Sequence, residues 1–166
     1  MTETRRRVTV ERVTLETTKK FDDVLAGIYE GISRPDLKAA VKTWNEAETY
    51  EEFQAAVAKT SGPAGLTQFL RLDQDAALGK LPDTPQRRQV RLIVGNAFTM
   101  TQMTRYVPDA GSYAPTTILI WEDGDTVRVA YDLEASLVAP YGDERVSKVA
   151  RELDEEVLTL LRNAVS

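Results

Sequence analysis

The feature that most constrains the fold is a pair of alternating segments at residues 116–122 and 126–132. In both segments apolar side chains recur at every second position, which is typical of a β-strand with one buried face. Asp123-Gly124 lies between them, and this dipeptide is favoured in tight turns whose central residues need positive φ. The sequence therefore predicts a β-hairpin, the clearest strand pair in the chain.

A long amphipathic helix is predicted to follow the hairpin and to close the chain, beginning after Gly142-Asp143. Its apolar residues keep helical spacing to the end: Val146, Val149, Ala150, Leu153, Val157, Leu160, Leu161 and Ala164. The acidic run Asp154-Glu155-Glu156 is interpreted as solvated surface on the polar face of this helix. Alternatively, part of the apolar face extends beyond the sheet and binds a partner protein.

Three further segments have the pattern of strands. Residues 6–16 alternate β-branched positions with an irregularity near Glu11-Arg12, and residues 66–72 form a second segment. Residues 90–94, VRLIV, are apolar at almost every position, as in a buried central strand.

Helical spacing is found in four shorter segments. These are Phe21 to Ile32, Leu37 to Trp44, Thr49 to Val57 and Asn96 to Val107. Helices and strands are not interleaved one for one, and 166 residues suit one domain. We therefore predict a single α+β domain over residues 1–166, with a mainly antiparallel sheet and helices packed on it.

Composition restricts the chemistry of this chain. It contains no cysteine and no histidine, which excludes thiol catalysis, thiolate metal sites and any Ser-His-Asp triad. We expect no metal and no cofactor. A net charge of −5 argues against nucleic-acid binding, and no apolar stretch reaches the roughly 18 residues of a membrane span. The expected location is the cytoplasm.

Five residues are candidates for ligand binding: Gly95, Asn96, Tyr106, Tyr113 and Ser136. Gly95-Asn96 lies at a strand-to-helix junction, where backbone N–H groups favour a carboxylate or phosphate. The simpler interpretation is that Asn96 only caps the helix. The tyrosines combine apolar bulk with a polar tip, so they line a pocket mouth or wedge between loops.

Acid–base chemistry is the alternative for the polar residues after the hairpin. Asp132 and Glu134 could serve it if burial raised the pKa of one of them. The candidate catalytic residues are Asp132, with Tyr113 or Tyr131 as the acid. In this hypothesis Asn96 and Ser136 lie near Asp132.

The C-terminal half resembles a known family. The matching runs are IVGNAFTMTQM, YVPDAGSYAPTTILIWEDGDTVRVAYD and SLVAPYGDERVSKVARELDEEV. They resemble the family catalogued as domain of unknown function 302, with the best match over residues 66–166. Ala97 stands where the family often has proline, and Leu133 follows Asp132 where many members have Asp-Pro. The resemblance implies a small α+β domain, commonly dimeric, with no established activity, and makes residues 33–62 a helical insertion.

We therefore expect a non-enzymatic protein that forms a homodimer and binds a small apolar or anionic ligand. The alternative is an isomerase- or lyase-type enzyme that uses Tyr and Asp side chains with backbone N–H groups. We expect neither a nucleic acid nor a membrane among its partners.

Overall fold

Six strands form one sheet in the computed structural model, which describes residues 1–166. The strands are β1 (Arg12–Thr17), β2 (Ile32–Ser33), β3 (Leu66–Asp73), β4 (Gln89–Gly95), β5 (Thr116–Asp123) and β6 (Thr126–Asp132). Their order across the sheet is β1-β6-β5-β4-β3-β2, and every neighbouring pair is antiparallel except β2 with β3. The prediction of an α+β fold with a mainly antiparallel sheet is confirmed.

The central hairpin forms as its sequence predicts. β5 and β6 pair antiparallel up to Asp123 and Thr126, and Gly124 in the turn has a φ of 61°. Ile118 and Ile120 on β5 and Val129 on β6 are fully buried, because all three lie on the same face of the sheet.

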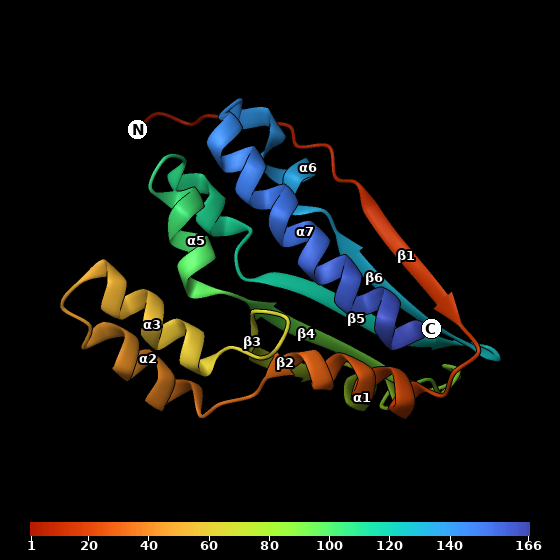
Figure 1. Cartoon of the computed structure of the whole chain (residues 1–166). Helices are drawn as coiled ribbons and strands as arrows, with labels where there is room; N and C mark the ends of the chain where they lie inside the picture. The colour runs from red at the N-terminus through yellow and green to blue at the C-terminus, as the bar shows by residue number, and fades with distance from the viewer.

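Two long helices cover that face (Figure 1). They are α1 (Phe21–Gly31) and α7 (Glu144–Val165). The apolar residues of α7, including Leu153, Val157 and Leu161, are buried against the sheet and α1. The core thus uses the apolar stripe of α7, and the alternative that this stripe binds a partner is wrong for its buried residues. No helix is both long enough and apolar enough to cross a membrane.

The other helices lie beyond one end of the sheet or in the connections. They are α2 (Leu37–Asn45), α3 (Tyr50–Thr60), α4 (Asp75–Leu78), α5 (Ala97–Thr104) and α6 (Glu134–Val138), with 3₁₀ turns η1 (Pro108–Ser112) and η2 (Ala139–Tyr141). α2 and α3 form a hairpin at one corner (Figure 1), with a small core of Ala40, Trp44 and Val57. α5, α6 and the start of α7 enclose another small core around Met103.

The first strand is shorter than the alternation at residues 6–16 predicts. β1 begins at Arg12, which pairs with Asp132, the last residue of β6. Residues before Glu11 have no partner strand to pair with, so they continue as an arm without regular structure.

Candidate functional site

The open face of the sheet is the one opposite α1 and α7. Side chains alternate along each strand, so the residues between the buried ones lie on this face. The register aligns them in rows across the sheet: Leu70, Ile93, Thr117, Asp132 and Arg12 in one row, and Leu72, Arg91, Leu119, Ala130 and Thr14 in the next. The face therefore combines apolar positions on β3 to β5 with charged positions on β1, β4 and β6.

A hollow of about 290 Å³ lies on the open face. Its lining residues come from β1, β4, β5, β6 and the residue after β3: Arg12, Gln74, Arg91, Thr117, Leu119, Ala130 and Asp132. Ala130 is the small residue of its row, which leaves room above the sheet between longer neighbours.

One of the two arginines in the hollow is already paired. Arg12 donates from Nε to Asp132 Oδ1 at 2.6 Å and from a terminal nitrogen to Oδ2 at 2.9 Å. These hydrogen bonds hold the pKa of Asp132 below its usual value, and they raise the pKa of Arg12. Asp132 is therefore an ionised partner of Arg12 and has no proton to donate near neutral pH.

Arg91 is different, because no carboxylate pairs with it. One terminal nitrogen donates to Thr117 Oγ1 at 3.1 Å, and its Nε is buried without any hydrogen-bond partner. The hollow thus holds two guanidinium groups against the single carboxylate of Asp132, within a chain of net charge −5.

A second polar cluster lies on the helical side of the sheet. Asp154 of α7 is 5% exposed and accepts three hydrogen bonds. Its donors are the Tyr131 hydroxyl at 2.7 Å, the Glu134 N–H at 2.8 Å and the Ala135 N–H at 3.0 Å. Burial raises the pKa of Asp154, which these donors oppose.

The interpretation of Asp154 as solvated surface is therefore wrong. Asp154 lies four residues after Ala150 and four before Leu158, so helical geometry places it on the buried stripe of α7. This spacing was the signal in the sequence that could have identified Asp154 as a buried residue. The polar identity of the residue and its two acidic neighbours obscured it.

Glu134 is a buried carboxyl group with a strongly raised pKa. It is fully buried, and neither carboxyl oxygen has a hydrogen-bond partner. Burial raises its pKa to about 8, and the charge of Asp154 adds to this shift. The nearby Thr116 hydroxyl opposes the shift. Glu134 is therefore mainly protonated at neutral pH.

The three predicted catalytic residues do not converge. Tyr131 points to the helical side and bonds Asp154, whereas Asp132, the next residue of β6, lies on the open face. Tyr113 lies after η1, and its hydroxyl is 3.2 Å from that of Tyr141. Glu134 has the raised pKa that the acid–base hypothesis requires, but it does not line the hollow. An enzymatic role for these residues stays a prediction.

Asn96 acts as a helix cap. Its Oδ1 accepts from the N–H groups of Phe98 and Thr99 at 2.9 and 3.1 Å, and its Nδ2 donates to the Gly65 carbonyl at 2.8 Å. Gly95 lies against Pro115, in a space where a Cβ would be 3.1 Å from the proline Cβ. The adjoining hollow measures about 80 Å³, well below the roughly 300 Å³ of a typical ligand site.

The remaining ligand candidates lie apart from Asn96 and make contacts within the chain. The guanidinium carbon of Arg145 lies 3.8 Å from the centre of the Tyr106 ring. Ser136 on α6 accepts from the Glu11 N–H at 3.0 Å and donates to the Leu133 carbonyl at 2.6 Å. The structure thus does not gather the five candidates into one pocket, and ligand binding by them stays a prediction.

Arg91 is absent from these candidates, although the sequence contains a signal for it. Arg91 is the one charged residue in VRLIV, between the buried Val90 and Leu92. Alternation places its side chain on the opposite face from theirs. A charge in the middle of a central strand requires a partner or an open surface, and Arg91 has the second.

Comparison with known proteins supports the resemblance seen in the sequence. The model of the domain of unknown function DUF302 matches residues 41–164. A crystal structure of an uncharacterized conserved DUF302 protein from Bacillus stearothermophilus is similar in fold, with a TM-score of 0.64. The two chains are 11% identical, and the similarity covers 92% of this chain and 97% of the other. No curated protein matches. Because the family model covers most of its length, this chain belongs to the DUF302 family.

Proposed function

We propose that this protein binds a small organic acid in the hollow of the open sheet face. The acid's carboxylate lies against the Arg91 guanidinium, and its apolar body lies on Leu119 and Ala130. The protein acts by binding and catalyses no reaction on this ligand.

The state of Arg91 is the observation that carries the proposal. Its buried Nε has no acceptor, and an unsatisfied buried donor costs roughly 1–3 kcal/mol. A carboxylate in the hollow can accept charge-assisted hydrogen bonds from the terminal nitrogens of one guanidinium. A bound oxyanion would thus supply the charged partner that this chain does not provide for Arg91.

The surroundings of Arg91 favour a small ligand of mixed character. The hollow, at about 290 Å³, is near the lower end of the roughly 300–1,000 Å³ of small-molecule sites. Asp132 is engaged by Arg12 through two hydrogen bonds, so it competes weakly for Arg91. The same pairing leaves no protonated group beside the ligand, which supports binding without acid–base chemistry.

Calorimetric titration with benzoate and hexanoate tests this function, and benzamide and hexanamide serve as neutral probes of the same shape. The acids should bind, and the amides should bind at least 10-fold more weakly, since they lose the charge-assisted pair. Arg91→Gln should weaken acid binding by roughly 10- to 100-fold. Arg87→Gln, in the exposed loop before β4, is the matched control and should bind like the wild type.

The proposal fails if neither acid binds, or if Arg91→Gln binds the acids as tightly as the wild type. ¹⁵N NMR provides a direct readout, because the Nε–H signal of Arg91 should shift on addition of an acid and not on addition of its amide.

A further inference from the structure

We infer that residues 133–142, which we call the latch segment, detach locally from the rest of the fold as pH rises, because detachment lets the buried Glu134 release its proton to water. The latch segment contains α6 and η2 and joins β6 to α7. Glu134 lies on the helical side of the sheet, so the inference requires no ligand in the hollow of the open face.

Few buried side chains hold the latch segment in place. Within it only Glu134 and Val138 are buried, and Val138 packs in the small core around Met103. A segment with so few buried contacts opens at a lower free energy than the strands of a core. At its C-terminal end Gly142 has a φ of 68°, and no atom lies within 4 Å of a Cβ placed on it. The backbone can therefore turn at Gly142 without collision.

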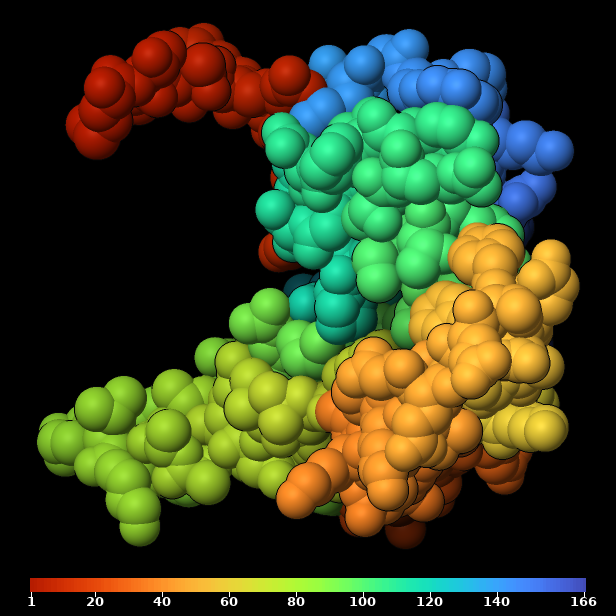
Figure 2. Space-filling view, turned by 90° about the vertical axis from the view of Figure 1, so that its left-hand side faces the viewer, coloured from red at the N-terminus to blue at the C-terminus, as the bar shows by residue number.

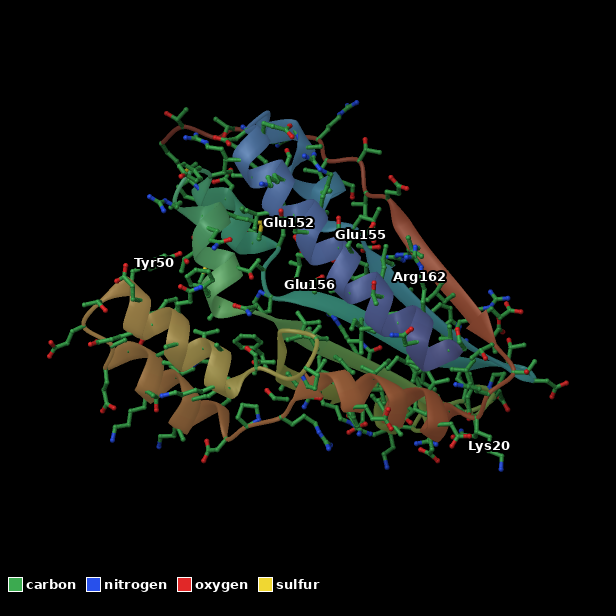
Figure 3. The ribbon with its side chains drawn as sticks, in the orientation of Figure 1. Lys20, Tyr50, Glu152, Glu155, Glu156 and Arg162 are labelled. Carbon is green, nitrogen blue, oxygen red and sulfur yellow. The ribbon has the colours of Figure 1, made fainter.

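Asp154 of α7 holds the N-terminal end of α6. Its carboxylate accepts from the N–H groups of Glu134 and Ala135 at 2.8 and 3.0 Å. Its neighbours Glu155 and Glu156 are exposed on α7 (Figure 3), so Asp154 is the member of the acidic run that turns inward. Ionisation of Glu134 in the closed protein would place a negative charge beside the carboxyl group that holds α6.

The charged groups that act on Glu134 all disfavour its ionised form. They are Asp154 on α7 and Asp132 on β6, and no lysine or arginine is among them. The Thr116 hydroxyl on β5 favours ionisation, whereas the Tyr131 hydroxyl on β6 is directed to Asp154. Burial therefore holds the pKa of Glu134 at about 8 in the closed protein, against the ordinary 4.5 of a solvated carboxyl group.

The direction of the pH dependence follows from these two values. Between them, detachment of the latch segment releases a proton, so the equilibrium constant for opening should rise about 10-fold per pH unit. From pH 5 to pH 7 the increase amounts to about 100-fold. Above about pH 8 the closed form is ionised as well, and the constant should level off.

Detachment of the latch segment also frees the start of β1. The Glu11 N–H donates to Ser136 Oγ at 3.0 Å, and the Leu133 N–H donates to the Glu11 carbonyl at 2.9 Å. The guanidinium carbon of Arg6 lies 4.0 Å from the centre of the Tyr141 ring, and Figure 2 shows the N-terminal arm leaving the body of the protein beside the residues coloured light blue. These three contacts all end in the latch segment, so a rise in pH should release the arm together with α6.

Native-state amide hydrogen exchange, followed by NMR at about pH 5 to 8, tests the inference. After correction for intrinsic exchange, the protection of the Ala135 N–H should fall by about 100-fold between pH 5 and pH 7. The N–H of Leu92 in β4 reports global unfolding, and it should be more protected than Ala135 at each pH. Low concentrations of urea should reduce the protection of Leu92 and leave that of Ala135 unchanged, since local opening exposes little surface.

Two variants separate the role of Glu134 from that of other carboxyl groups. Glu134→Gln cannot ionise, so the protection of Ala135 should be the same at pH 5 and pH 7. Glu30→Gln, at an exposed position of α1, is the matched control and should keep the wild-type pH dependence. Far-UV circular dichroism checks that both variants fold.

Three results would overturn the inference. They are an Ala135 protection factor that does not change with pH, a Glu134→Gln variant that retains the wild-type change, and a common protection factor and urea dependence for Ala135 and Leu92. The last result would mean that Glu134 becomes solvated only when the whole protein unfolds. Arg91→Gln should keep the wild-type exchange profile, so the outcome of this experiment is separate from that of the acid titration.

Discussion

Replacement of Glu134 by glutamine is expected to stabilise the protein at neutral and alkaline pH. Glutamine has nearly the same shape as the protonated glutamic acid and cannot ionise. Wild-type Glu134 is fully buried, and its oxygens have no hydrogen-bond partners, so its ionised form is strongly disfavoured in the folded state. In the unfolded chain the same carboxyl group is solvated and ionises freely.

The magnitude follows from the two pKa values. The folded value of about 8 exceeds the ordinary value of 4.5, so this group's stability contribution is fully present below pH 4.5 and falls as pH rises toward 8. The slope is about 1.4 kcal/mol per pH unit, which at pH 7 gives a loss of about 3 kcal/mol. Glu134→Gln removes this loss, so its advantage over the wild type should grow from near zero at pH 4 to about 3 kcal/mol at pH 7.

Urea denaturation at pH 4 to 8 measures this difference, which corresponds to a gain in Tm of roughly 6–12 °C at pH 7. Glu30→Gln, at an exposed position of α1, should keep the wild-type profile. Asp154 is shifted in the same direction and contributes to both proteins, so the difference between their profiles isolates Glu134. Parallel profiles for the wild type and Glu134→Gln would show that Glu134 is ionised in the folded protein, and the reasoning would be refuted.

Two further predictions concern the same core and the connection after α3. Tyr131→Phe removes the hydroxyl that donates to Asp154 at 2.7 Å, so it should lower the free energy of unfolding by about 1–2 kcal/mol in urea denaturation, with native circular dichroism retained. Gly62→Ala would place a Cβ 2.5 Å from the backbone of Ile32, and backbone cannot move aside as a side chain can. It should destabilise by about 2 kcal/mol or more, whereas Gly111→Ala, 3.4 Å from its nearest neighbour, should change Tm little.

The local sequence pattern was sufficient to predict the hairpin of β5 and β6 and the helix α7. Alternation around Asp123-Gly124 and the long stripe of apolar residues each describe contacts that an element makes through one face. A period of two or of 3.6 residues reports such a face directly. The local sequence pattern could not predict where β1 begins, because its first residue depends on where its partner strand β6 ends. Val8 and Val10 alternate like strand residues, but no strand lies beside them.

The polar groups were harder to predict, because their roles depend on contacts between distant segments. Asp154 lies 20 residues beyond Glu134, and only the packing of α7 over the end of β6 brings its carboxylate to the Glu134 N–H. Asn96 could be assigned as a helix cap from its position, since its partners are two and three residues away. Contacts between residues close together in the chain produce a recognisable spacing in the sequence. Contacts between distant segments produce no such spacing.

In β4 the sequence pattern and the observed burial differ. Its apolar run is typical of a strand buried on both faces, and the sequence predicts such a central strand. Within one chain, Val90, Leu92 and Val94 are buried under the helices, while Ile93 on the other face is only half-buried. An amphipathic sheet with one solvated face would carry polar residues at the positions of Ile93, Leu119 and Leu72. The open face instead mixes these apolar residues with polar ones such as Arg91 and Thr117, so the apolar run alone did not show that one face of β4 is open.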